Sequence, residues 1–464
     1  KQLASLTSQD ILIVPKLGDI SSGDFERLVE TIPVGIAAAD LQRTELKVLS
    51  LSELDYSRYK VTHDKDHVDE QVINFVDINN QSKLSDDFIT ARLRVETGKP
   101  LDVSVLEEDI SKLYGLDIFE SIRYEIVAKD SSTGVVIHAK EKRWGPDYLQ
   151  FGFSLSADFE GGSSFNASLA YTRTEINERN GEWRTLLQAG EDPLIFTEFY
   201  QPIDVGSRYY ITPKLVLFEK TNLNFFDDDQ IVAEYRLSRK GMSLAVGREL
   251  GEWGDIHMGL QRFYGDASVR IGDPTLAGFE YDISETFLRF AADKVDNLYF
   301  PTSGYIANIE WIASRSRLGS DTSFDQILLD SLGAITWDRQ TYFSGLRFYS
   351  TINNDAPIQS RFRAGGFQNL SGFQKNELSG QDFGLFRLGT MRQINDIQWM
   401  PAYLGLTLEI GNVWESAGDL FYNDTLVGGN IFLGVDSAIG PFYTAYGYTE
   451  GGNHSFYISL GRAL

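Results

Sequence analysis

The strongest constraint on this chain is a period-two alternation of apolar and polar residues that runs from about Asp147 to Leu464. Helical periodicity is nearly absent over this stretch. The first alternating segment has an apolar parity made of Leu149, Phe151, Phe153, Leu155, Ala157 and Phe159. Its other parity is polar or small and consists of Gln150, Gly152, Ser154, Ser156 and Asp158. Because successive side chains of a strand point to opposite faces, each such segment separates an apolar surrounding from a polar one.

The number of alternating segments favours a membrane barrel over a soluble sandwich. A half-buried sheet in a soluble sandwich gives the same alternation. About 16 segments follow one another here, however, which is typical of a closed sheet in a membrane. One of them is a long bent strand over Ile231–Leu250. We therefore predict a mainly β fold in which residues 145–464 form a 16-stranded antiparallel transmembrane β-barrel.

Turn residues separate the predicted strands. Short turns are expected at Gly161-Gly162, Asp192-Pro193, Lys240-Gly241, Gly251–Gly254, Gly440-Pro441 and Gly451-Gly452. Glycine and proline favour such turns because they supply or fix backbone angles that other residues adopt less readily. Longer connections alternate with the short ones. We expect this asymmetry to distinguish short turns at the periplasmic end of the barrel from longer loops at its outer end.

Composition agrees with a barrel and excludes several other classes of protein. The chain contains no cysteine, which excludes disulfides and cysteine-ligated zinc. Its net charge of -24 argues against a nucleic-acid partner. Aromatic residues make up 13% of the chain, and the aromatic girdles at two membrane interfaces would require many of them. No stretch approaches the roughly 20 consecutive apolar residues of a membrane-spanning helix.

A compact module of helices and strands is predicted before the barrel, over residues 69–144. Its elements are a strand near 71–76, helices at about Ser85–Glu96 and Ser104–Tyr114, and strands at Ile118–Val127 and Val135–Lys142. The second helix has a capping box from Ser104 to Glu107 and a glycine stop at Gly115. This order of elements, together with the phrase from Leu113 to Ile122, resembles a POTRA domain.

Three phrases in the barrel region resemble a superfamily that includes BamA, TamA and the two-partner-secretion transporters. They are Tyr299–Gly304, Glu409–Trp414 and Gly440–Tyr443. The final strand also resembles the superfamily's C-terminal β-signal, with Phe456, Ile458, Leu460 and Leu464, although the last residue is usually Phe. The resemblance implies a bacterial outer-membrane location with the POTRA domain in the periplasm. It also implies contact with outer-membrane lipids, and the barrel assembly machinery as a partner during insertion.

A long loop at residues 353–382 contains the best-known motif of that superfamily. The motif is a hydrophobic residue followed by Arg-Gly-Phe or Arg-Gly-Tyr, and here it reads Leu370, Ser371, Gly372 and Phe373. In the superfamily the arginine reaches into the lumen and pairs with an acidic residue of the inner wall. Glu409 stands at the matching acidic position. The resemblance therefore implies a loop that folds inward, with Ser371 in place of the usual cation.

The first part of the chain resembles the end of a patatin-like lipase domain, which points to the PlpD-type autotransporters of type V secretion. The segments that resemble the patatin-like domain are Asp10–Ile20 and Asp24–Arg27. Three later segments, Glu182–Thr185, Phe199–Pro202 and Ala233–Arg236, also resemble the PlpD-type subfamily. Residues 1–45 are then a remnant of that domain, and residues 46–68 are a linker. The implied function is a translocator or anchor that carries a fused patatin-like phospholipase passenger to or across the outer membrane. The alternatives are an outer-membrane protein assembly factor and a two-partner secretion transporter. The resemblance leaves a homodimer open.

No catalytic, cofactor or metal site is predicted within this chain. The patatin elements Gly-x-Ser-x-Gly and Asp-Gly-Gly/Ala do not occur in it, so the lipid acyl hydrolase activity of the parent protein is expected to lie upstream. His63 and His67 have the spacing of two metal ligands on a helix, but a solvated linker accounts for them better. Three adjacent side chains, Asp227–Asp229, cannot converge on calcium, which favours an acidic turn.

One short strand and one helix are predicted before the linker. The strand is Ile11–Pro15, and Ser21-Ser22 offers a cap to the helix that follows. That helix has an apolar stripe made of Phe25, Leu28, Val29 and Ile32. A single helix cannot bury such a stripe alone, so we expect its partner surface to belong to the upstream domain.

Overall fold

The computed structural model describes residues 10–18, 20, 28–63, 72–129, 132–159, 162–227, 230–273, 275–395, 397, 399–415 and 424–462. They divide into two compact units. The described residues of the first unit lie within 1–73 and 98–103, and those of the second lie within 74–97 and 104–464. None of the described helices is both long enough and apolar enough to cross a lipid bilayer.

The first unit is mainly helical. It contains α1 (Leu28–Leu41), α2 (Arg43–Leu46), η3 (Lys47–Leu49), α3 (Glu53–His63) and a two-residue pairing of β1 (Val72–Ile73) with β3 (Lys99–Pro100). In α1, Val29 and Ile32 of the predicted apolar stripe are 74% and 60% exposed. The predicted cap Ser21-Ser22 and Phe25 lie outside the described residues. Residues 11–15, predicted as a strand, form no regular element.

The predicted linker contains a helix, α3, and a local interaction explains why. The hydroxyl of Ser52 accepts a hydrogen bond from the backbone N–H of Asp55 at 3.2 Å, as a helix N-cap does. Glu53 and Asp55 then place negative charge in the first turn, where it complements the helix dipole. The side chain of His63 and all of His67 lie outside the described residues.

The POTRA region of the second unit has the predicted order of strand, two helices and two strands. These elements are β2 (Phe75–Gln81), α4 (Asp86–Thr90), α5 (Val103–Gly115), β4 (Phe119–Lys129) and β5 (Ser132–Glu141). β5 lies in the middle of the sheet, parallel to β2 and antiparallel to β4. Phe88, Ile89, Leu106, Leu113 and Ile137 are almost completely buried and form its core.

The first POTRA helix is shorter than predicted. The sequence suggested a helix over Ser85–Glu96, but α4 ends at Thr90. Ser85 caps its start, since the Ser85 hydroxyl accepts from the Phe88 N–H at 3.1 Å. After the helix, the backbone N–H of Arg94 donates to Asp109 of α5 at 2.7 Å instead of to a helical carbonyl. A tertiary hydrogen bond therefore takes the place of a helical one at Arg94.

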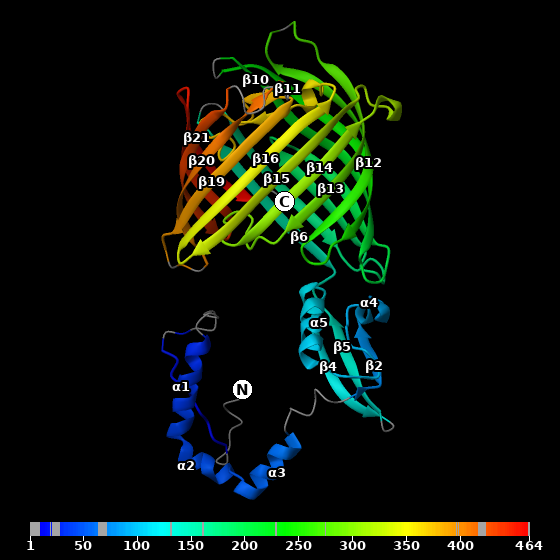
Figure 1. Ribbon diagram of the computed structural model, residues 1–464, viewed down its shortest axis with the longest axis vertical. Helices are drawn as coiled ribbons and strands as arrows, with labels where there is room; N and C mark the ends of the chain where they lie inside the picture. The colour runs from blue at the N-terminus through cyan, green and yellow to red at the C-terminus, as the bar shows by residue number, and fades with distance from the viewer. Residues whose placement is uncertain are drawn as a thin grey trace. The chain divides into compact units, whose positions relative to one another are not determined.

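The rest of the second unit is a closed antiparallel barrel of 16 strands, as predicted (Figure 1). The strands are β6 (Asp147–Ala157), β7 (Ser163–Arg173), β8 (Glu182–Gly190), β9 (Leu194–Pro202), β10 (Tyr209–Asp227), β11 (Gln230–Glu249), β12 (Gly254–Ile271), β13 (Phe279–Asp293), β14 (Gly304–Ser314), β15 (Phe324–Trp337), β16 (Gln340–Asn353), β19 (Asp382–Gln393), β20 (Ala402–Trp414), β21 (Leu426–Ser437), β22 (Gly440–Thr449) and β23 (Asn453–Arg462). Chain neighbours pair throughout, and β23 pairs with β6 to close the barrel.

The predicted apolar parity faces outward. Leu149 and Phe151 of β6 are 61% and 79% exposed, although they are large and apolar. In β7 the opposite parity, which includes Asn166 and Ser168, is buried. Exposed apolar side chains on every second position are what a lipid-facing wall requires, because the surrounding lipid takes the place of a protein core.

Two expectations about turns are wrong. Lys240-Gly241 is not a turn but lies inside β11, which runs unbroken from Gln230 to Glu249. Short connections also occur at both ends of the barrel. We call the end at which β6 begins the proximal end and the opposite end the distal end. Strand order places residues 251–253 at the proximal end, whereas residues 191–193 and 450–452 lie at the distal end.

Candidate functional site

The connection between β16 and β19, residues 354–381, folds into the barrel, and we call it the interior loop. It contains η6 (Ile358–Ser360) and a small hairpin of β17 (Phe362–Ala364) and β18 (Leu378–Gly380). Its apolar residues Phe362, Ala364, Leu370 and Phe373 are buried against Phe383 and Leu385 on the inner face of β19. This apolar cluster inside the wall gives the loop a core of its own.

Ser371 of the interior loop lies directly against Glu409 of β20, and both residues are fully buried. The backbone N–H of Ser371 donates to Glu409 Oε2 at 2.7 Å, and its hydroxyl donates to Oε1 at 2.8 Å. The wall adds two more donors to Oε1, from Thr407 at 3.1 Å and from the amide of Asn430 at 2.8 Å. A buried carboxylate is thus satisfied by neutral donors, two of them from the loop.

The backbone of the loop motif is held by a second set of contacts from β22 and β23. The Gly372 N–H donates to the Tyr457 hydroxyl at 2.8 Å, and that hydroxyl donates to the Phe373 carbonyl at 2.7 Å. Gly372 has a φ of 117°, and a Cβ there would lie 2.8 Å from the backbone N of Thr449. Only glycine allows both this conformation and this approach. The structure therefore brings all four motif residues and Glu409 together at the inner wall.

A second segment enters the barrel from its proximal end, and it belongs to the Tyr299–Gly304 phrase. Phe300, in the connection of β13 to β14, is 1% exposed and stacks between Tyr403 and Tyr443 at centroid distances of 4.9 and 4.8 Å. In the order of strands around the barrel, β20 and β22 are remote from β13 and β14. Phe300 therefore reaches across the interior. Phe367 of the interior loop packs on the same group of side chains, 5.4 Å from Tyr443. We call this group the aromatic cluster; its main members are Phe300, Phe343, Phe367, Met391, Tyr403, Phe432, Tyr443 and Tyr457.

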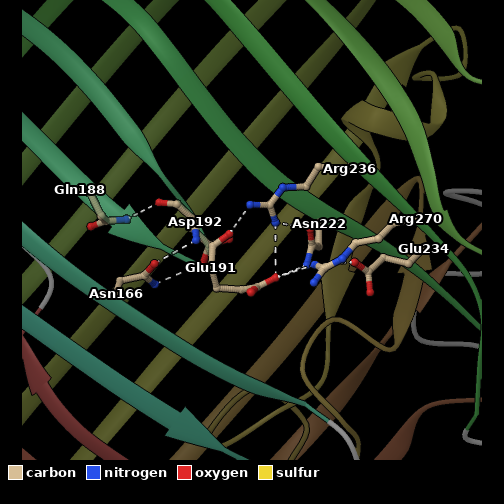
Figure 2. A network of polar contacts seen from close by, with 8 residues as sticks. All are labelled: Asn166, Gln188, Glu191, Asp192, Asn222, Glu234, Arg236 and Arg270. Atoms are coloured by element: carbon tan, nitrogen blue, oxygen red, sulfur yellow. Dashed lines mark hydrogen bonds and ion pairs between the residues drawn. The ribbon is translucent and has the colours of Figure 1, made fainter.

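The Ala233–Arg236 phrase lies in a polar network at the distal end, where β10 and β11 extend beyond β9. Figure 2 shows Arg236 and Arg270 converging on Glu191, which lies in the turn between β8 and β9. Arg270 Nη1 is 3.1 Å from Glu191 Oε1 and 3.0 Å from Glu234 Oε1, and Arg236 Nη2 donates to the Glu191 carbonyl at 2.6 Å. Arg236 and Arg270 belong to the extended strands and Glu191 to the turn, so the network fastens the turn to these strands.

The predicted β-signal residues Phe456, Ile458 and Leu460 lie on β23, whereas Leu464 falls outside the described residues. β23 forms the closing seam with β6. Within the described residues this seam has five paired positions, from Ile458 opposite Ala157 to Arg462 opposite Phe153. The neighbouring pair β22–β23 has eight. As far as the structure describes these strands, the seam has a shorter ladder than its neighbour.

Comparison with known proteins identifies the family of this barrel. Residues 152–463 match the model of the Omp85 superfamily domain. The chain belongs to the Omp85 superfamily. Residues 71–142 match the POTRA family, described as a surface antigen variable number repeat. An Omp85 member with a closed barrel of this kind is an outer-membrane protein.

Solved structures of other Omp85-type barrels share the fold. BamA from Haemophilus ducreyi, in a form lacking POTRA domains 1–3, aligns with a TM-score of 0.66 at 14% identity, covering 84% of this chain and 85% of that chain. CdiB from Acinetobacter baumannii aligns with a TM-score of 0.55 at 10% identity, covering 85% and 74%. CdiB from Escherichia coli aligns with a TM-score of 0.55 at 11% identity, covering 96% and 89%.

Several site residues of this Omp85 barrel were not found from the sequence. Thr407, Asn430 and Tyr457 complete the seat of the interior loop, and Phe300 fills the interior from the other end. Period-two alternation places Thr407, Asn430 and Tyr457 on the inner face, whereas Phe300 lies in a connection between strands, where alternation gives no face. Only the pairing of β20 with β21, which sets Thr407 opposite Asn430, brings the first two together.

Proposed function

We propose that this Omp85 protein is a translocator and anchor for a fused N-terminal patatin-like phospholipase passenger, which it carries to or across the outer membrane. The patatin-like phrases near the start of the chain and the one POTRA domain recognised before the barrel support this assignment. On the basis of the same resemblance, we also propose that the protein forms a homodimer. The chain itself contributes the barrel and its interior loop, and we propose that it has no hydrolase centre of its own.

The observation that carries the proposal is the way in which the interior is filled. The interior loop enters from the distal end, the Phe300 segment enters from the proximal end, and the two share one aromatic cluster. A polypeptide can pass only when at least one of them moves. At Glu409 the loop is held by hydrogen bonds from the neutral donors of Ser371, without an ion pair between the described residues of the loop and this carboxylate. Such hydrogen bonds to a charged group contribute about 1.5–3 kcal/mol each, and water can take their place when the loop moves.

The test uses a passenger fused ahead of Lys1 with an epitope tag, expressed in a Gram-negative host. Protease added to intact cells should remove the tag if the passenger is translocated. A periplasmic marker protein must stay intact in the same cells. Anchoring without translocation predicts that the tag is protected until the outer membrane is permeabilised. A passenger that reaches neither the outer membrane nor the cell surface would contradict both forms of the proposal.

The short seam between β6 and β23 favours a second candidate, an assembly factor for other outer-membrane proteins. Among the described residues the seam has five paired positions and the neighbouring pair has eight, which favours opening of the wall at the seam. The chain has no cysteine, so a disulfide between Ser156→Cys and Ser459→Cys, which are register partners, can be introduced cleanly. Locking the seam should stop an assembly factor. It should leave a translocator that works through the interior active once the bond has formed.

A further inference from the structure

A cavity of about 350 Å³ lies inside the barrel, between the wall, the Phe300 segment and the interior loop. Its apolar lining comes mainly from the aromatic cluster. Its polar lining consists of Asn308, Asp330, Ser331, Arg347, Gln368 and Arg387. Two guanidinium groups and one carboxylate therefore line this space. Neither the loop motif nor the passenger accounts for it.

Arg387 of β19 is attracted by the carboxylates of Glu409 and Asp330, but it forms no direct ion pair with either of them. Its Nη1 donates to the carbonyl of Gln368 at 3.0 Å and approaches the Gln368 side-chain oxygen at 3.3 Å. Its Nε and Nη2 have no hydrogen-bond acceptor among the residues that the structure describes. Glu409 stands opposite Arg387 in the pairing of β19 with β20, but its oxygens already accept from Ser371, Thr407 and Asn430.

Arg347 of β16 is held in place differently. Its Nε lies 3.2 Å from Asp330 Oδ1, and its Nη1 donates to the side chain of Asn369 at 2.8 Å. Asp330 is fixed in turn, because the Tyr349 hydroxyl lies 2.7 and 2.8 Å from its two oxygens. Asp330 thus forms its ion pair with Arg347, and no carboxylate accepts a hydrogen bond from Arg387 Nε or Nη2 among the described residues.

We propose that this cavity binds a small oxyanion, such as a phosphate or a carboxylate, on the guanidinium of Arg387. The free Nε and Nη2 donors form the planar fork that suits two oxygens of one anion. Guanidinium donors without an acceptor in a confined interior are costly, and an anion that accepts their hydrogen bonds removes that cost. Because Gln368 belongs to the interior loop and Arg387 to the wall, the bound anion would tie the loop to the barrel.

The test measures anion-dependent stability of the whole chain folded in detergent micelles. Inorganic phosphate and acetate are titrated against chloride at constant ionic strength, and the midpoint of thermal unfolding is followed by tryptophan fluorescence. A ligand that binds only the folded state raises this midpoint in a saturable way. Arg387→Gln should weaken the saturating anion about tenfold or more, as expected for the loss of a charge-assisted hydrogen bond.

The matched control is Arg289→Gln. Arg289 also lies on the inner face of the barrel, but it pairs with Glu310 at 2.6 Å and does not line the cavity. This variant should keep the full anion response. If Arg387→Gln does not fold, Arg387→Lys provides the test, because it keeps the charge and loses the fork, and it should bind more weakly. An absence of saturation in the native protein, or an equal response in the Arg387 variants, overturns the site. A response to acetate but not to phosphate assigns it to carboxylates.

Discussion

Glu409 holds the interior loop through one carboxylate, so its charge state is open to direct test. Glu409→Gln presents an N–H₂ group toward a set of donors, and at least one hydrogen bond from Ser371, Thr407 or Asn430 is lost. The cost should be about 1.5–3 kcal/mol, the range for hydrogen bonds to a charged group. A thiol introduced by Phe373→Cys should then react faster with a large, membrane-impermeant reagent. Glu310→Gln, which removes an inner-wall carboxylate away from the loop, should leave that rate unchanged.

Gly447 of β22 has no side chain, and this leaves space for the interior loop against the barrel wall at a second point besides Gly372. A Cβ at this residue would lie 2.7 Å from the Cβ of Ser371 and 2.9 Å from the Gly372 N. Gly447→Ala should therefore push the loop off the wall and destabilise the protein by about 1–3 kcal/mol, as overpacking does. Chemical denaturation provides the measurement. Gly333→Ala is the control, because the nearest atom to its Cβ is 3.9 Å away. Equal losses of stability in both variants would show that replacing any strand glycine by alanine has this effect.

In the POTRA domain, Glu108 should titrate far below an ordinary glutamate. Hydrogen bonds from Arg94 first and Lys112 second lower its pKa from 4.5 to about 2. Because the folded pKa is depressed, the stabilising contribution is complete above about pH 4.5 and is lost as the pH falls toward 2. Carboxyl-carbon NMR of labelled glutamate should show Arg94→Gln raising this pKa. An unchanged titration in that variant would contradict the assignment.

At the scale of a strand, the two faces of β6 should respond oppositely to a charge. Phe151 is 79% exposed on the outer face, whereas Ser154 has the other parity. Phe151→Asp places a carboxylate in lipid and should cost up to a few kcal/mol, depending on its depth. Ser154→Asp should be tolerated. Unboiled gels of membrane fractions report how much folded barrel each variant forms. Loss of assembly in Ser154→Asp alone would reverse the orientation of this strand.

The sequence predicted the faces of the strands better than their lengths. Alternation is local, so the outward parity of β6 and β7 can be read directly from their residues. Gly241, by contrast, suggests a turn and yet lies inside β11, where a Cβ would come within 2.1 Å of the Arg262 carbonyl. That glycine serves close approach between β11 and β12 rather than reversal of the chain. Whether a glycine marks a turn or a close approach of two strands depends on the neighbouring strand, and the sequence around Gly241 alone does not show this.

The candidate site was predictable to the extent that it depends on a contiguous motif. Leu370–Phe373 and the acidic Glu409 were recognised from the sequence, and the structure places Ser371 on Glu409. Thr407 and Asn430 were missed, because their contribution depends on the register between β20 and β21. A one-residue shift of that register would turn Asn430 to the outer face. Alternation alone therefore identifies a set of inner-face residues without saying which of them meet.

At the scale of the whole molecule, we expect the barrel chain to lack esterase activity. The proposed passenger carries the nucleophile elbow, and no Gly-x-Ser-x-Gly occurs among residues 1–464. Purified folded chain should hydrolyse a short-chain ester substrate no faster than a boiled sample. A fluorescent fluorophosphonate should leave it unlabelled. Covalent labelling that disappears on prior heating would reveal a serine nucleophile in this chain and contradict the proposal.

The shared aromatic cluster also imposes an order of events on biogenesis. Tyr443 donates a hydrogen bond to the carbonyl of Tyr299 across a sequence separation of 144 residues, and Tyr457 holds Gly372 across 85. Ribosomes finish both entering segments well before they make β22 and β23, which secure them. Contacts at such separations form late because long chain segments must first be brought together. Barrel closure and the filling of its interior therefore depend on the same terminal strands, so a chain truncated before Tyr443 would lose both together.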